Sequence, residues 1–164
     1  MEILFYFAAL IAVISTLMVI MESNPVHALL YLVVSLLSVA FIFYLLGAPF
    51  AAALEVIVYA GAIMVLFVFV VMMLGQAGEE SARMPVRAWL GPFLLSTAIL
   101  AELVYVLAGK GSPVGVREVG PKEVGMALFG PYLLGTELAS MLLLSGLTGA
   151  CHLGRGYQGV ISDQ

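Results

Sequence analysis

Four side chains that can exchange protons interrupt the apolar stretches of this sequence. Glu55, Glu102 and Glu137 lie inside or at the edge of long apolar runs, and Tyr59 follows Glu55 by four residues. Burying a charged acid in lipid costs several kcal/mol, so such groups face protein or water, or bind a proton. The chemistry that these residue types indicate is proton transfer.

Each acid also has a structural interpretation. Glu55 can be an acid near the membrane surface that is solvated by headgroups, and Glu102 lies about two turns from the end of its apolar run and can reach toward the surface. Glu137 lies about 9 Å into the last run by helix rise, and it is a candidate buried acid that pairs with a partner subunit or internal water. The sequence leaves both interpretations open for each acid.

The run after Glu55 is the one around which we interpret the others. Residues 56–74 contain no charged side chain and are long enough, as a helix, to cross a hydrocarbon core of about 30 Å. A lone strand in lipid would leave its backbone groups unpaired, so these residues predict a membrane-spanning helix. Gly61, between Ala60 and Ala62, interrupts the helix and indicates either close helix packing or an irregularity such as a π-bulge or hinge.

The remaining reactive residue types do not form a recognisable site. His27 and His152 are far apart and lie near the ends of apolar runs, where an interfacial polar role is the expected one. Cys151 and His152 are neighbours, and neighbouring side chains on a helix point about 100° apart, which excludes a catalytic pair between them. We therefore expect no metal and no cofactor on this chain.

The last apolar run has a face of small residues. Gly146, Ala150 and Gly154 recur at every fourth position. This spacing is typical of membrane helices whose backbones approach closely, so it predicts a helix-packing face.

The composition places the chain in a bilayer. It is 63% hydrophobic and 10% charged, whereas soluble domains carry about 25% charged residues. The net charge of −4 rests on so few charges that it indicates no nucleic-acid partner. The six Lys and Arg residues divide evenly between the two sides of the expected topology, so charge does not predict its orientation.

The expected fold class is an all-α integral membrane protein with five transmembrane helices and a short interfacial helix before the fifth. The spans are expected at about residues 3–21, 26–46, 51–74, 89–108 and 131–153. They form a single membrane domain, residues 1–153, followed by a polar tail, residues 154–164. Asn24 is suited to cap the second helix and Pro25 to its first position. The short interfacial helix is expected near residues 122–129.

Three stretches resemble the J subunit of bacterial respiratory complex I (NADH:quinone oxidoreductase), which is equivalent to the mitochondrially encoded chain 6. They are NPVHALLYLVVSLL at 24–37, LEVIVYAGAIMVLFVFVVMML at 54–74 and LFGPYLLGTELASMLLL at 128–144. The resemblance covers nearly the whole chain, in order and with matching spacing. Glu102 is not part of the family pattern, so no family role is assigned to it.

The resemblance implies a core membrane subunit of a proton-translocating NADH:quinone oxidoreductase. Such a subunit spans the bacterial inner (plasma) membrane five times, with a periplasmic N-terminus and a cytoplasmic C-terminus. It packs against the A, H, K and N subunits and the lipid bilayer. It carries no redox centre of its own, because FMN, the iron–sulfur clusters and quinone are held by other subunits.

The resemblance also implies which residues matter. The family's third span holds a π-bulge, which maps onto Tyr59–Val65 around Gly61, and Tyr59 helps to complete a hydrated path toward buried glutamates of the K subunit. A bulge that appears and disappears would rotate the residues after it by about 100°. The residues expected to form this proton gate are Tyr59, Gly61, Met64, Val65, Phe67 and Val68, together with Glu55.

Two other functions remain open at this point. The chain could be a purely structural scaffold of the membrane arm, which requires that the third span never changes register. It could also be a small independent ion transporter, but transporters commonly show internal repeats and a polar pocket at the midplane. The sequence shows neither feature.

Overall fold

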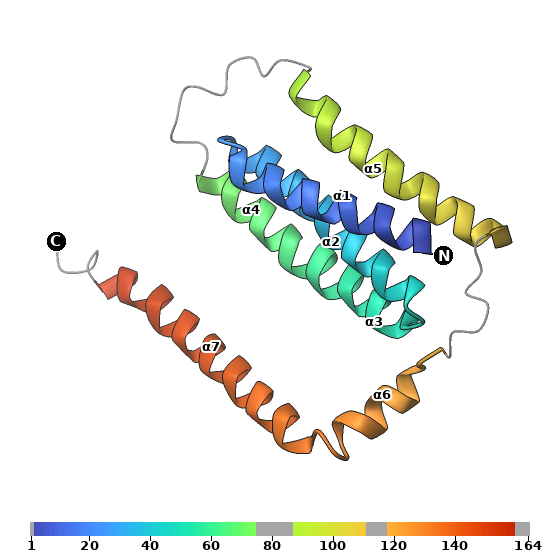
Figure 1. Ribbon diagram of the computed structural model, residues 1–164. Coiled ribbons are helices and arrows are strands. Elements are labelled where there is room, and N and C mark those ends of the chain that lie inside the picture. The colour runs from blue at the N-terminus through green and yellow to red at the C-terminus, as the bar shows by residue number, and fades with distance from the viewer. Residues whose placement is uncertain (1, 75–86, 111–117, 160–164) are drawn as a thin grey trace. The chain divides into compact units, whose positions relative to one another are not determined.

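The computed structural model describes residues 2–74, 87–110 and 118–159, and all regular elements within them are helical (Figure 1). The elements are α1 (Glu2–Met21), α2 (Pro25–Leu45), α3 (Pro49–Leu54), η1 (Glu55–Ile63), α4 (Met64–Leu74), α5 (Arg87–Tyr105), η4 (Val106–Lys110), α6 (Pro121–Leu128) and α7 (Leu133–Gly159). Here η denotes a π-helix. Five helical stretches are long and apolar enough to cross a membrane: Glu2–Met21, Pro25–Leu45, Pro49–Leu74, Trp89–Gly109 and Leu133–Gly154. The expected all-α, five-span class is confirmed.

The first two turns between spans follow local backbone chemistry. The Asn24 Oδ1 atom accepts a hydrogen bond of 3.0 Å from the Val26 N–H, and Pro25 occupies the first turn of α2, as the sequence predicts. At the other end of α2, Gly47 has φ 82°, a left-handed conformation that favours glycine and ends the helix. Gly109, with φ 76°, adopts the same left-handed conformation within η4, near the end of the fourth span.

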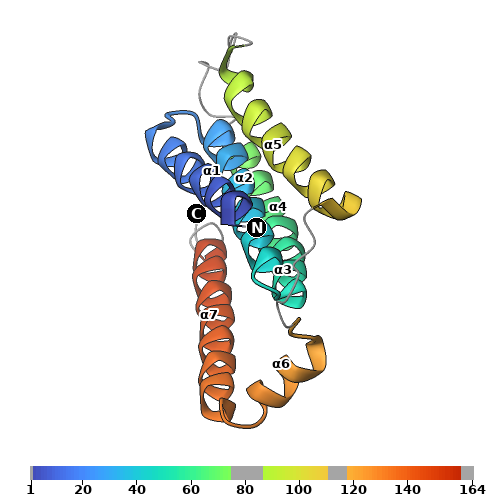
Figure 2. The ribbon, with the colours of Figure 1, turned by 45° about the vertical axis from the view of Figure 1, so that its right-hand side comes forward.

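The described chain falls into two compact units, residues 1–120 and 121–164. In the first unit α2 is the central helix, and it packs against α1, α5, η1, α3 and α4. Figures 1 and 2 show α3, η1 and α4 continuing one another as a single rod, the third span. The expectation of one membrane domain over residues 1–153 stays a prediction.

Six buried residues of α2 are spaced alternately four and three positions apart, so they form one continuous face of the helix. Its members are His27, Tyr31, Val34, Ser38, Phe41 and Leu45. Two apolar clusters form where this face meets α1 and α5. The Ile99 cluster is Ile11, Val34 and Ile99, and the Val106 cluster is Ala8, Phe41, Leu45 and Val106. These clusters fix α1, α2 and α5 against each other.

The second unit contains α6 and α7, joined by a short bend. The Thr136 hydroxyl donates hydrogen bonds to the Leu128 carbonyl at 3.1 Å and to the Tyr132 carbonyl at 3.2 Å, which tie the start of α7 to the end of α6. Helix α6 lies where the short helix is expected, while its interfacial position stays a prediction. No residue of the Leu133–Gly154 stretch is buried within this chain.

The end of α7 differs from the expected boundary. The helix continues to Gly159 rather than ending near residue 153, so the first part of the expected polar tail is helical. Extending an existing helix adds one hydrogen bond for each residue that is fixed, so glycines alone do not end it. The remainder of the tail, residues 160–164, and the expected loops at 75–86 and 111–117 lie outside the described residues.

Candidate functional site

The third span contains a nine-residue π-helix, η1, from Glu55 to Ile63. In this geometry each N–H bonds to the carbonyl five residues earlier instead of four. The Met64 N–H, directly after the segment, still donates to the Tyr59 carbonyl in this way, and it also donates to the Gly61 carbonyl. The dihedral angles on both sides are α-helical, with φ −64° and ψ −39° at Leu54 and φ −68° and ψ −37° at Met64. The helix therefore widens within the span without a break.

Gly61 lies where the wide turn is most crowded. A Cβ atom at this position would lie 3.1 Å from the carbonyl oxygen of Val56, which is five residues earlier. That distance is shorter than an ordinary van der Waals contact, because the π register brings the earlier carbonyl over the glycine. The absent side chain thus favours this register.

The π-helix differs in its bounds from the segment implied by the family resemblance. The resemblance placed it at Tyr59–Val65, whereas the structure has it at Glu55–Ile63. Tyr59 and Gly61 lie inside it as expected, but Met64 and Val65 already belong to α4. Glu55 is the first residue of η1, so the acid lies within the irregular segment. The sequence did not predict this, because the expected segment began at Tyr59.

The expected gate residues divide into two sets by exposure. Met64 is only 3% exposed and lies at the contact of the third span with α2. Val65 and Phe67 are 65% and 53% exposed, respectively, so they point away from the interior of the first unit. Val68, one turn after Met64, is half-buried. The register of η1 determines which of these side chains meets α2.

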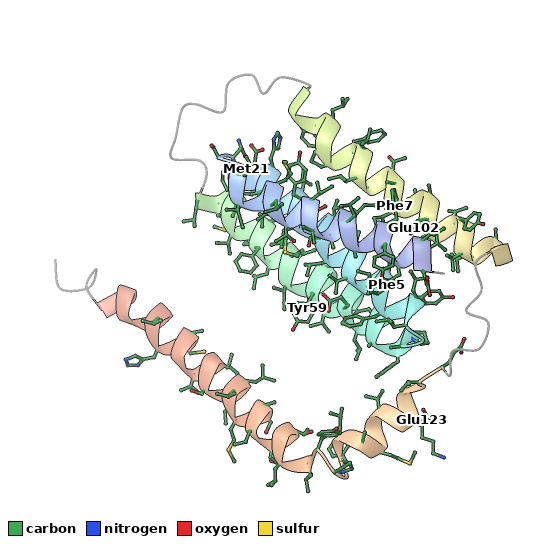
Figure 3. The ribbon with its side chains drawn as sticks, in the orientation of Figure 1. Phe5, Phe7, Met21, Tyr59, Glu102 and Glu123 are labelled. Atoms are coloured by element: carbon green, nitrogen blue, oxygen red, sulfur yellow. The ribbon has the colours of Figure 1, made fainter. Side chains whose placement is uncertain are left out.

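Tyr59 and Glu55 are the two polar side chains of η1. Tyr59 is half exposed, and Figure 3 shows it at the outer edge of the first unit. Glu55 is half-buried. Neither side chain hydrogen-bonds to another residue in the part of the chain that the structure describes, so both remain available to water or to a neighbouring protein.

The other two acids differ from each other in burial. Glu102 does not reach the surface, because it is 5% exposed and lies between α5 and α1 (Figure 3). Glu137 is exposed within its own unit. Burial of Glu137 by a partner stays a prediction. The sequence could not decide either case, because spacing alone does not show which face of a helix meets its neighbours.

The two histidines also differ in burial. His27 is 2% exposed, and its ring meets the Trp89 ring edge-on at a centroid distance of 5.6 Å, while its interfacial position in the membrane stays a prediction. One turn further along α2, Tyr31 places its hydroxyl against Gly91, where a Cβ atom would collide with it. His152 and Cys151 are exposed. The sequence signals for the first two contacts are Trp89 and Gly91 themselves, which lie at the start of the fourth span.

The small residues of the last span have no partner within their unit. Gly146, Ala150 and Gly154 are exposed, and a Cβ atom at either glycine would meet nothing within 4 Å. Their predicted role in helix packing stays a prediction.

Comparison with known proteins identifies the family. The family model for NADH-ubiquinone/plastoquinone oxidoreductase chain 6 matches residues 15–153, which is most of the chain. The chain belongs to this family. The chain 6 match covers α2, the whole third span with η1, and α7 as far as Leu153.

Individual relatives agree with the chain 6 assignment. NADH-quinone oxidoreductase subunit J of Pseudomonas aeruginosa is 58% identical over 161 residues, covering 94% of this chain and 97% of the relative. The subunit J of Escherichia coli strain K12 is 52% identical over 160 residues, covering 94% and 87%. The subunit J of Rhodobacter capsulatus is 37% identical over 158 residues, covering 89% and 77%.

Proposed function

We propose that this chain is a non-redox core membrane subunit of a proton-translocating NADH:quinone oxidoreductase, and that η1 is its moving part. The observation that carries this proposal is the π-helix at Glu55–Ile63, which lies in a span whose one charged residue is Glu55 and contains a glycine at its most crowded position. Chain 6 membership and the relatives' names support the assignment to the complex. Five apolar helices support a multi-pass protein of the bacterial inner membrane.

The gate works through helix register. When the π segment converts to α-helix, the hydrogen-bond register shifts by one residue. The residues after the segment therefore rotate by about 100° around the helix axis. Met64 would then leave its buried position against α2, and exposed apolar neighbours such as Val65 would move toward it. Bulky apolar side chains close a water path by drying it, and their rotation opens it again.

The two polar groups of η1 supply the protein side of such a path. Tyr59 carries a hydroxyl that both donates and accepts hydrogen bonds, and Glu55 carries a carboxylate. Tyr59 lies at the outer edge of the first unit, where a neighbouring subunit or a file of water can reach it, and Glu55 is one turn before it and half-buried. We propose that this path leads toward acids of the K subunit, and that it couples quinone reduction to proton transfer toward the antiporter-like subunits.

The position in the complex belongs to the same proposal. The chain packs against the A, H, K and N subunits, with its N-terminus in the periplasm and its C-terminus in the cytoplasm. The exposed α7, with its small-residue face and Glu137, offers a surface for these contacts. FMN, the iron–sulfur clusters and quinone are bound by other subunits.

The test is the ratio of protons pumped to NADH oxidised by the assembled complex in membrane vesicles. Gly61→Leu adds a branched side chain against the Val56 carbonyl. Val65→Gly removes an apolar side chain that would exclude water from the path. We expect both variants to lower the ratio while the complex still assembles. Gly125→Leu is the matched control, because Gly125 lies in the short helix α6, outside the spans, and a Cβ atom added there would meet nothing within 4 Å. A normal ratio in an assembled Gly61→Leu complex would refute the gate and leave the scaffold function.

A further inference from the structure

Glu102 is a buried acid that the proposed gate does not use. It lies on α5, three residues after Ile99 and four before Val106, so all three share one face of the fourth span. Ile99 and Val106 belong to the two apolar clusters that join α5 to α1 and α2. Glu102 therefore lies between these clusters, inside the three-helix interior.

Ser38 occupies the corresponding position on α2. It follows Val34 of the Ile99 cluster by four residues and precedes Phe41 of the Val106 cluster by three. The matching spacing places the hydroxyl and the carboxyl at the same level, with an apolar layer on each side. Ser38 is 0% exposed, and its hydroxyl donates to the Val34 carbonyl at 2.8 Å.

The Glu102 carboxyl has no compensating group within the described chain. Both Oε1 and Oε2 are buried and lack a hydrogen-bond partner among the described residues. The described titratable side chains on the helices that pack against it, and on its own helix, are Glu2, Tyr6, His27, Tyr31, Tyr44 and Tyr105, and none hydrogen-bonds with it. Helices α1 and α2 contain no Lys or Arg. On the fourth span, Lys110 is eight residues further along and Arg87 fifteen residues before it.

A carboxylate in these surroundings would be strongly disfavoured, since an unpaired buried charge costs several kcal/mol and instead takes up a proton. A neutral carboxylic acid needs no cation, and its O–H can donate to an oxygen such as that of Ser38 after a small rotation.

We propose that Glu102 is a proton-binding site in the interior formed by α1, α2 and α5. The acid is neutral while the two apolar clusters are closed, and it releases its proton only when water reaches the level of Ser38. The reaction is the reversible transfer of one proton between the carboxyl group and water, with no other reactant.

Infrared spectroscopy of the assembled complex with carbon-13-labelled glutamate in this chain tests the proposal. We expect a carboxylic-acid C=O band at neutral pH that Glu102→Gln removes and Glu102→Asp shifts. Glu118→Gln is the matched control, because Glu118 is exposed outside the spans, and it should leave the band unchanged.

Two results would overturn the proposal. One is that, at neutral pH, the Glu102→Gln spectrum lacks a carboxylate band of the wild type but keeps all of its carboxylic-acid bands. The other is failure of the Glu102→Gln complex to assemble, because the amide has the shape of the neutral acid and must be tolerated if the acid is neutral.

Discussion

Because Gly61 lies close to the Val56 carbonyl, adding a single methyl group at position 61 can test the hydrogen-bond register of η1. Gly61→Ala would place its Cβ atom 3.1 Å from that oxygen, a few tenths of an ångström inside ordinary contact. In the α register the carbonyl five residues back no longer lies over position 61, so the added methyl group is tolerated there. The substitution therefore penalises one register and leaves the other unchanged.

The size of this effect follows from overpacking. Inserting a methyl group into a filled space costs about 1–3 kcal/mol, and the lower end applies here because the carbonyl needs to tilt only slightly. A penalty of about 1 kcal/mol changes the ratio of the two registers roughly fivefold. The general preference of helices for alanine over glycine does not contribute, because it applies to both registers.

The assay is electron cryo-microscopy of the assembled complex, with particles sorted by the backbone register of residues 55–63. We expect the share of particles with the π register to fall in Gly61→Ala relative to the wild type. Gly135→Ala makes the same change at a helical glycine with nothing within 4 Å and should leave that share unaltered. An undiminished π register in Gly61→Ala, or an equal fall in the control, would show that the glycine does not set the register.

Two further predictions concern the packing of α2. Gly91→Ala would drive a methyl group into the Tyr31 hydroxyl, so we expect a loss of about 1–3 kcal/mol, seen as a lower melting temperature of the complex and recovered in part by adding Tyr31→Phe. No recovery in the double variant would argue against this contact. Phe41→Ala removes a buried ring from the Val106 cluster, so a loss of about 3–5 kcal/mol is expected by the same measurement. Phe67→Ala, at an exposed position, should have a much smaller effect unless a neighbouring subunit covers it.

The sequence predicted the features that depend on short-range chemistry. The five spans follow from apolar length, because lipid leaves a backbone no alternative to internal hydrogen bonding. The start of α2 follows from Asn24 and Pro25, whose side chains act on their own neighbours. The presence of an irregular turn near Gly61 follows from the glycine and from the family resemblance.

The features that depend on orientation between helices were missed. The sequence allowed Glu102 to reach the surface, but the structure buries it, because the face of α5 that carries it also carries Ile99 and Val106. The contact of His27 with Trp89 was also not predicted. The bounds of η1 also differ, since the hydrogen-bond register of a helix is a cooperative property that no single residue fixes.

Helix α2 connects the proposed gate to the rest of the first unit. It contacts η1 and α4 of the third span, and it also contacts α1 and α5, which enclose Glu102. Protein interiors are close-packed, so rotating Met64 away from α2 must leave a void, bring in another side chain or shift α2 itself. The first outcome is costly, and the other two change the surroundings of α2. A change of register in η1 therefore cannot remain confined to the third span, which distinguishes a gate from a passive irregularity of the helix.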